Sequence, residues 1–229
     1  MHIPGMKTAV LSTAEGFELL KQEWNDLLHK SSSNVVCLTH EWLSAWWQTF
    51  SGSRSLHIVT VRDSSGTLLA IAPMAIIKAP YRGITIRKIS FLANGHSPCA
   101  DFIVHKDRRQ EGLAAIFGHL SRYDSWDLVE LQTVAEDSET LSFMQNAAKK
   151  AGIPAGVQES LETPFIPISS TWDEFLGGRS AKFRKVLRNK INRAERTGSH
   201  CACAASSMPA ACRRPRTPWP ASWPGATTS

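Results

Sequence analysis

The sequence predicts an α/β fold of the mixed α+β kind, in which helices pack on one sheet of antiparallel and parallel strands. Residues 56–77 contain two apolar runs joined by Asp63-Ser-Ser-Gly66, a pattern typical of an antiparallel hairpin. Residues 107–151 then follow a helix, strand and helix pattern, the order in which crossover helices join parallel strands. Together these two regions argue against a helical bundle and against a fully parallel sheet.

The N-terminal region predicts a strand over 7–12 and then two helices. Ser12-Thr-Ala-Glu15 has the spacing of a capping box, so we expect the first helix to begin there. A second helix is expected from about Thr39. Its three tryptophans are expected in the core or in a groove wall. The apolar residues of the first helix recur at helical spacing and are Phe17, Leu20, Trp24, Leu27 and Leu28.

The middle of the chain alternates between strand and helix patterns. A helix over 107–123 presents Leu113, Ile116, Phe117 and Leu120 on one face, which predicts that it packs on the sheet. A second helix over 138–151 ends at Gly152. The remaining predicted strands cover residues 84–92, 100–105 and 127–134, with a final extended segment over 157–168.

Two further helices are predicted after residue 170. Thr171-Trp-Asp-Glu174 forms another capping box, and Gly177-Gly178 ends the short helix that it starts. Ser180 can cap the next helix over 181–197, which is rich in Lys and Arg. The apolar residues that share one face of it are Phe183, Leu187, Ile191 and Ala194.

The net charge of +6 is unevenly distributed along the chain. Through Thr171 there are 15 Lys and Arg against 17 Asp and Glu, whereas residues 172–200 contain 8 against 3. Because the main body is almost neutral, we do not expect nucleic acid to be a partner. The basic character belongs to the helix over 181–197 and to three arginines near the end.

The last 30 residues, from 200 to 229, contain no Leu, Ile, Val, Phe, Tyr, Lys, Asp or Glu. A segment of this composition cannot bury enough apolar surface to offset the entropy of ordering. We therefore expect a disordered tail over 199–229, either a wrong reading frame or a foreign end, attached to an interrupted protein. The expected division is one domain over 1–170, connecting basic helices over 171–198, and this tail.

Several classes of protein are disfavoured by what the sequence lacks. No apolar run approaches the roughly 20 residues of a membrane-spanning helix, and no secretory leader is evident, so a cytoplasmic location is expected. Cys37 and Cys99 are far apart in sequence and suggest no disulfide framework. Neither a P-loop nor a Gly-x-Ser-x-Gly elbow occurs.

Five segments carry a resemblance to a known family: THEWLSAWWQTF, LLAIAPM, SFLANGHSPCADFIV, WDLVELQTV and TWDEFLGGRSAKFRKVLRNKINRAERTG. They resemble the N-terminal half of the CelD-like acetyltransferases, in the FemAB-like branch of the GNAT acyltransferases. The resemblance implies acyl transfer from acetyl-CoA or another acyl-CoA to an amine or hydroxyl acceptor, in polysaccharide or cell-envelope biosynthesis. It also implies that the second GNAT-like half is missing, so this chain alone is expected to be incomplete and inactive.

One motif argues for the acyl-CoA separately. Arg109, Gly112 and Ala114 match the GNAT pattern Arg/Gln-x-x-Gly-x-Gly/Ala between a predicted strand and a helix. Small residues allow backbone amides to approach a pyrophosphate, the helix N-terminus favours anions, and Arg109 adds a charged donor. Asp107 and Glu111 would repel phosphate. The alternative is an amphipathic helix in which Gly112 has no special role.

The basic helix over 181–197 is the second candidate site. Lys182, Arg184 and Arg188 would bind an anionic substrate or partner, which makes a non-catalytic binding module the alternative function. The simpler interpretation is a solvated face on a connecting helix. No aromatic residue alternates with the basic ones on that face, which disfavours single-stranded nucleic acid.

Other residues give weaker signals. Asp101 could serve as a general base, but a turn or edge position accounts for it equally simply. Glu130 is assigned no role. Metal binding is not expected, because neither set of His and Cys residues has the spacing of a zinc site. The two sets are His96, Cys99 and His105, and His200, Cys201, Cys203 and Cys212.

Overall fold

The computed structural model describes residues 5–122, 126–159 and 171–196, and the chain divides into two compact units, 1–163 and 164–229. In the first unit the strands are β1 (Lys7–Leu11), β2 (Ser55–Arg62), β3 (Leu68–Tyr81), β4 (Ile84–Phe91), β5 (Ile103–Val104) and β6 (Leu128–Glu130). Its helices are α1 (Ala14–Leu19), α2 (Lys21–His29), η1 (Val36–Leu38), α3 (His40–Phe50), η2 (Lys106–Arg108), α4 (Arg109–Leu120) and α5 (Glu139–Lys150). The second unit contains α6 (Trp172–Gly177) and α7 (Ala181–Arg196).

The sheet has the order β1-β2-β3-β4-β6, and β5 pairs with β3 beside β4. The pairs β1–β2, β2–β3, β3–β4 and β3–β5 are antiparallel, whereas β4–β6 is parallel. A mixed sheet of the predicted class is therefore confirmed. Because β4 and β5 are both antiparallel to β3, and β6 follows β4, these three strands point the same way.

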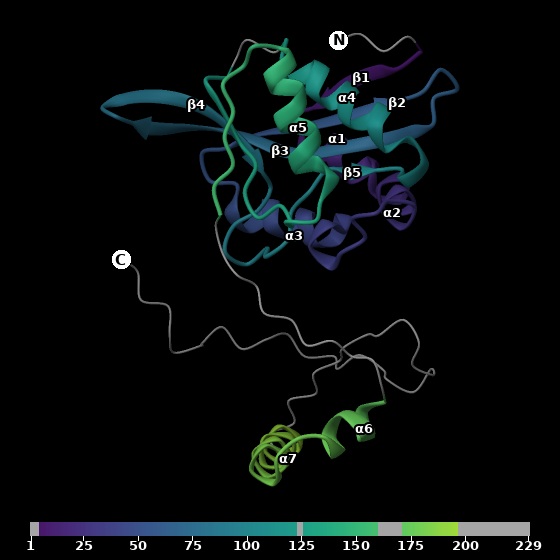
Figure 1. Ribbon diagram of the computed structural model, residues 1–229, viewed down its shortest axis with the longest axis vertical. Helices are drawn as coiled ribbons and strands as arrows, with labels where there is room; N and C mark the ends of the chain where they lie inside the picture. The colour runs from purple at the N-terminus through teal and green to yellow at the C-terminus, as the bar shows by residue number, and fades with distance from the viewer. Residues whose placement is uncertain (1–4, 123–125, 160–170, 197–229) are drawn as a thin grey trace. The chain divides into compact units, whose positions relative to one another are not determined.

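Helices cover both faces of the sheet (Figure 1). Alternation along β2 assigns its side chains to two cores: Leu56 and Ile58 pack with the helices α1 to α3, while Val59 and Val61 pack with α4. This alternation is what the two-residue period of a strand requires when both faces are buried.

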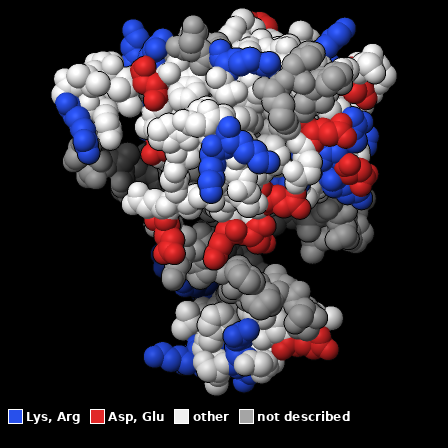
Figure 2. Space-filling view, turned by 45° about the horizontal axis from the view of Figure 1, so that its top comes forward, with Lys and Arg blue, Asp and Glu red and all other residues white. Residues whose placement is uncertain are grey.

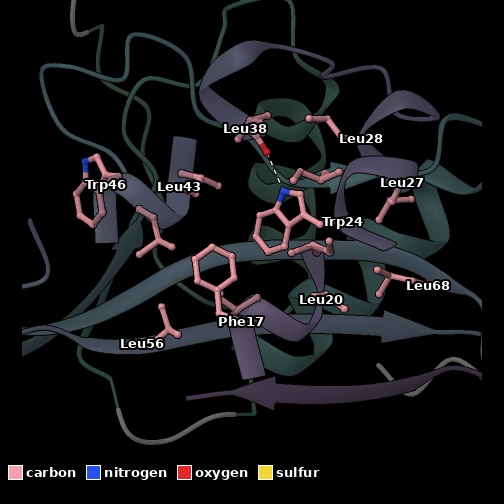
Figure 3. Close-up of a cluster of buried hydrophobic side chains, with 14 of the residues drawn as sticks. Phe17, Leu20, Trp24, Leu27, Leu28, Leu38, Leu43, Trp46, Leu56 and Leu68 are labelled. Atoms are coloured by element: carbon pink, nitrogen blue, oxygen red, sulfur yellow. Dashed lines mark hydrogen bonds between the residues drawn. The ribbon is translucent and has the colours of Figure 1, made fainter. Parts of the chain in front are cut away.

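The first core is built around Trp24 of α2, which is fully buried (Figure 3). Its indole Nε1 donates a hydrogen bond of 2.8 Å to the carbonyl oxygen of Leu38. Phe17 lies 5.2 Å from Trp24 between ring centroids, so an aromatic pair anchors α1 and α2 on the sheet. The predicted periodicity of Phe17 to Leu28 is confirmed.

Local capping explains where most helices begin. Thr39 Oγ1 accepts from the amide of Trp42 and starts α3 as predicted. The predicted capping box at Ser12 is wrong by one residue: Thr13 is the N-cap and accepts from the amide of Gly16 at 3.1 Å. The single helix predicted from there divides at Leu20 into α1 and α2.

Two hairpin turns use left-handed backbone. Gly66 has φ +88° between β2 and β3, as predicted. At the β3–β4 turn, Arg82 and Gly83 have φ +48° and +85°, while Tyr81 pairs with Ile84. Positive φ at both central residues is the requirement of a two-residue hairpin that matches strand twist. The turn therefore depends on Gly83.

The strands after β4 are shorter than predicted. The expected strand over 100–105 is only β5, and the one over 127–134 is only β6. The segment expected to be extended over 157–168 has no strand pairing in its described part, 157–159. Residues 160–170 and the predicted tail over 199–229 lie outside the described residues, so these predictions and the domain division stay predictions.

In the second unit both predicted helix starts are confirmed. Thr171 and Glu174 form a reciprocal capping box at α6, and Ser180 Oγ accepts from the amide of Phe183 at the start of α7. Phe183 and Ile191 are 46% and 42% exposed. None of the described helices, in either unit, combines the length and the apolar character needed to cross a bilayer.

Candidate functional site

The candidate site lies where two strand–helix junctions meet. β5 and β6 point the same way, and each is followed by a helix, α4 and α5 respectively. Arg109, the first residue of α4, contacts Ser138, the N-cap of α5, with 3.3 Å between Nη2 and Oγ. The N-termini of both helices therefore meet beyond the carboxyl ends of parallel strands, which is where α/β sheets commonly bind ligands.

A buried carboxylate occupies this junction. Asp101 accepts hydrogen bonds from three hydroxyls: Thr140 Oγ1 donates at 2.6 Å, Ser138 Oγ at 2.7 Å and Ser33 Oγ at 2.9 Å. The amide of Phe102 donates to it at 2.7 Å. The side chain is only 9% exposed. Asp101 is thus a buried carboxylate with donors of the chain on both of its oxygens, which a simple turn or edge position does not account for. Its role as a general base stays a prediction.

Arg109 neutralises that carboxylate from the α4 side. Its Nη2 lies 3.4 Å from Asp101 and 3.1 Å from Thr140 Oγ1, and its Nη1 donates to Ser32 Oγ at 2.9 Å. Its Nε lies 3.3 Å from the exposed carboxylate of Glu139. The side chain is 8% exposed, so the guanidinium lies within the protein and serves internal partners. We call these six residues, Ser33, Asp101, Arg109, Ser138, Glu139 and Thr140, the junction cluster.

The opposite charges in the junction cluster have hydrogen-bond partners that allow them to be buried together. A buried ion pair is tolerated only when further hydrogen bonds satisfy both partners, and hydroxyls supply them here. Helix N-termini favour negative charge, and Asp101 and Glu139 provide it at α5. The Asp101 carboxylate therefore occupies the position at which the N-terminus of α5 would otherwise stabilise an anionic ligand.

The two small residues of the motif on α4 serve helix–sheet packing. A Cβ added to Gly112 would lie 2.5 Å from Val104 Cγ1 and 3.1 Å from the Cβ of Ala70. Ala114 is 5% exposed. Gly112 thus has a definite structural role, contrary to the interpretation in which it was incidental: it lets α4 approach β3 and β5 closely. Their predicted part in cofactor binding stays a prediction.

The loop before α4 remains the accessible part of this region. Lys106 and Asp107 are exposed. The guanidinium of Arg108 hydrogen-bonds the Glu111 carboxylate, and this contact lowers the pKa of Glu111. The amide of Asp107 donates to His105 Nδ1 at 3.3 Å. The loop therefore offers one exposed cation, while its acidic residues oppose an anion.

The predicted anion-binding residues of α7 differ in their surroundings. Lys182 and Arg188 are exposed. Arg184 is partly buried and its Nη1 donates to the carbonyl oxygens of Gly177 and Arg179, at 3.0 and 2.9 Å. A cation at the C-terminus of a helix satisfies its last carbonyls, so Arg184 caps α6. Two of the three residues are thus exposed to solvent.

The remaining predicted candidates have structural partners. His96 stacks on Phe50 with 5.5 Å between ring centroids, and Glu130 forms an ion pair of 2.6 Å with Lys88. His105 lies at the N-cap of η2. Within the described residues no group of three or more His, Cys, Asp or Glu is placed to hold a metal ion.

A histidine pair inside the α4 face was not anticipated. His57 Nε2 on β2 lies 3.3 Å from His119 Nε2 on α4, and His57 is only 3% exposed. Burial lowers the pKa of His57 to about 4, with His119 adding to the effect. Burial also lowers the pKa of His119. The signal available in the sequence was a histidine at an inward position of an alternating strand.

The surface carries no large field of one sign on the face drawn in Figure 2, where Lys and Arg are interspersed with Asp and Glu. Such a mixed surface gives little general attraction for polyanions. Binding of an anionic ligand would therefore depend on local groups.

Comparison with known proteins gives weak likenesses only. No family model matches the chain, and no curated protein matches it. Among solved structures, an aminoglycoside antibiotic 6'-N-acetyltransferase from Acinetobacter baumannii is 11% identical and has a TM-score of 0.39, over 71% of this chain and 100% of that one. A glucosamine-6-phosphate N-acetyltransferase from Arabidopsis thaliana is 11% identical with a TM-score of 0.38, over 69% and 98%. An integron cassette protein of V. cholerae is 10% identical with a TM-score of 0.40, over 77% and 100%. Likeness at this level carries no argument about activity.

Proposed function

We propose that the first unit is the acyl-CoA-binding lobe of an acyltransferase, which passes an acyl group to an amine or hydroxyl acceptor. The observation that carries this proposal is the meeting of the α4 and α5 N-termini beyond the carboxyl ends of β5 and β6. The sequence resemblance to CelD-like acetyltransferases supports it. An acceptor in polysaccharide or cell-envelope biosynthesis is part of the same proposal.

In this proposal Arg109 is a positioning residue. Because its guanidinium binds Ser32, Asp101 and Ser138, it fixes the start of α4 against α5. The first amides of a helix have no intrahelical acceptor, so those of α4 would receive the phosphates, with Lys106 as the adjacent cation. Gly112 and Ala114 keep α4 close to the sheet. The chain would thus orient the acyl donor by backbone rather than by Arg109 itself.

The acidic residues of the loop provide a direct test. Glu111→Gln removes a negative charge beside the proposed phosphate position and releases Arg108. We expect titration calorimetry with acetyl-CoA to show about threefold tighter binding, the size of one screened surface charge contact. Glu15→Gln, a matched change in the first turn of α1, should leave the affinity unchanged.

Two results would count against the proposal that the first unit binds acyl-CoA. One is the absence of saturable binding of acetyl-CoA to the wild-type chain. The other is equal affinity of the wild type and the Glu111→Gln variant, since a phosphate bound at the start of α4 must sense that carboxylate.

A second candidate function is recognition of an anionic partner by α7. Its supporting observation is that Lys182 and Arg188 are exposed while residues 181–193 contain no acidic side chain. Heparin is a suitable polyanion probe. If α7 is the site, the double reversal Lys182→Glu and Arg188→Glu should abolish heparin retention and leave acetyl-CoA binding intact. If α4 is the site, Glu111→Gln should change only acetyl-CoA binding.

A further inference from the structure

Two cysteines that are distant in sequence lie together in the fold. Cys37 belongs to η1 and is 8% exposed, whereas Cys99 lies in the segment between β4 and β5 and is partly exposed. Both are free thiols. The backbone amide of Cys99 lies near enough to the Cys37 thiol to lower its pKa, although burial is the larger effect and raises it. The Cβ of Cys99 is two bonds from this amide nitrogen, so the two cysteine side chains begin in the same neighbourhood.

Contacts on both sides fix this proximity independently of the thiols. Residues 30–42 run antiparallel to residues 97–106. The amide of Lys106 donates to the carbonyl oxygen of Lys30 at 3.0 Å, and Ser33 donates to Asp101 at 2.9 Å. On the far side, Trp42 Nε1 donates to Ser97 Oγ at 3.1 Å. Cys37 lies between Ser33 and Trp42, and Cys99 lies between their two partners, so the register itself brings the thiols together.

We propose that Cys37 and Cys99 form a redox modification site that closes to an intramolecular disulfide when a small disulfide oxidant is present. Oxidised glutathione is such an oxidant. A disulfide requires Cα atoms no more than about 7 Å apart, and the proposal requires this separation of the two segments that the Ser33–Asp101 and Trp42–Ser97 hydrogen bonds hold together. Cys99 is two residues from Asp101 and Cys37 is four residues from Ser33, so the disulfide would link the two segments that carry this hydrogen bond of the junction cluster.

The exchange begins at the more accessible sulfur. The Cys99 thiolate attacks one sulfur of oxidised glutathione, forms a mixed disulfide and releases one glutathione thiolate. The Cys37 thiolate then attacks the Cys99 sulfur and releases the second glutathione thiolate. The two cysteine sulfurs lose two electrons and two protons, and one oxidised glutathione becomes two reduced molecules. Because burial keeps the Cys37 thiol protonated, ring closure should be slower than the first step and should accelerate with rising pH.

Peptide mapping can distinguish this disulfide from others. Trypsin releases Cys37 in the peptide 31–54 and Cys99 in the peptide 89–106, while the other three cysteines fall in the peptide 197–213. After oxidation of the full chain and digestion without reductant, we expect 31–54 joined to 89–106. Reduction should separate them. Cys99→Ser should abolish the joined species, and Cys37→Ser should leave Cys99 as a glutathione adduct.

A second measurement is the thermal stability that the disulfide adds. Closing a loop of about 60 residues should raise Tm by about 10 °C in the oxidised wild type relative to the reduced protein. The oxidised Cys99→Ser variant should show no such rise. This partly exposed position also gives a readout if Cys37→Ser fails to fold.

The proposal is overturned if peptide 89–106 carries glutathione alone in the wild type. It is equally overturned if either thiol joins peptide 197–213 instead, or if Tm rises to the same extent in Cys99→Ser.

Discussion

The helices α4 and α7 carry basic side chains in opposite ways. On α4, Arg109 is 8% exposed and binds a buried carboxylate, and the neighbouring face buries His119 against His57. On α7, Lys182 and Arg188 are exposed. The motif on α4, which matches a cofactor site by its spacing, thus directs the side chain of Arg109 to partners inside the protein. On α7, which has no such motif, the basic side chains are exposed to solvent. Spacing on a helix indicates which residues share a face. Whether a charged side chain on that face binds internally or meets solvent is decided by the elements that pack against the face.

The largest expected difference between the two helices concerns stability. Arg109→Ala leaves Asp101 buried without its cation, so the free energy of unfolding should fall by about 3–5 kcal/mol. Arg188→Ala on α7 should change it by less than about 0.5 kcal/mol. Urea denaturation measures both. Similar costs for the two variants would mean that Arg109 is not in a buried ion pair in solution.

The next largest effect is the pH dependence that the α4 face contributes. His57 has a folded-state pKa of about 4, below the ordinary 6.5, so the unfolded chain binds a proton first as the pH falls. Stability from His57 is therefore complete above about pH 6.5 and lost toward pH 4, by about 3 kcal/mol. His57→Gln should flatten this part of a plot of unfolding free energy against pH. His29→Gln, at an exposed position of α2, should preserve it. A slope unchanged by His57→Gln would refute the assignment.

Substitutions of glycine in the first and second units extend the comparison with smaller expected changes in stability. Gly112→Ala places a methyl group 2.5 Å from Val104 Cγ1 and should cost about 2 kcal/mol. The second change Val104→Ala should recover part of this loss. Gly177→Ala in α6 meets open space and should cost nothing. Thermal unfolding followed by circular dichroism measures all three variants. A Gly112→Ala protein as stable as the wild type, with no further gain from Val104→Ala, would contradict the close approach of α4 to β3 and β5.

The smallest expected effect belongs to the second unit. Arg184→Gln removes the cation that binds the carbonyl of Gly177, the last residue of α6, and that of Arg179 just beyond it, and helix stability there should fall by about 0.5 kcal/mol. The helical signal of a chain carrying this change should decrease slightly. Lys182→Gln, two residues earlier on α7 and exposed, should not alter it. Equal signals from both variants would show that Arg184 does not cap α6.

Much of the fold could be predicted because local signals agree with the tertiary structure. The hairpin around Gly66, the cap at Thr39 and the stripe from Phe17 to Leu28 each depend on residues close in sequence. The length of β5 and β6 could not be predicted. The strand pattern over 100–105 is broken where Asp101 binds Ser138 and Thr140, which are partners from a distant part of the chain. The pattern over 127–134 contains Thr133, whose φ of +59° is incompatible with a strand.

The site was less predictable than the fold for the same reason. The sequence singled out Arg109, Gly112 and Asp101, but not that Arg109 and Asp101 would bind each other. Ser33, Ser138 and Thr140 gave no signal, because isolated hydroxyl residues are common in loops and at caps. The pairing of Cys37 with Cys99 depends on two antiparallel segments whose contact only the tertiary structure reveals.

The connection between β4 and β6 has a consequence for the order in which the molecule assembles. β2, β3 and β4 are joined by short turns, so their pairing closes small loops early. β6 pairs with β4 through only three residues and reaches it after 36 intervening positions that include α4. On a ribosome the meander can be complete before β6 has been synthesised. Amide protons at Leu128, Val129 and Glu130 should consequently exchange with deuterated solvent sooner than those at the centre of β3.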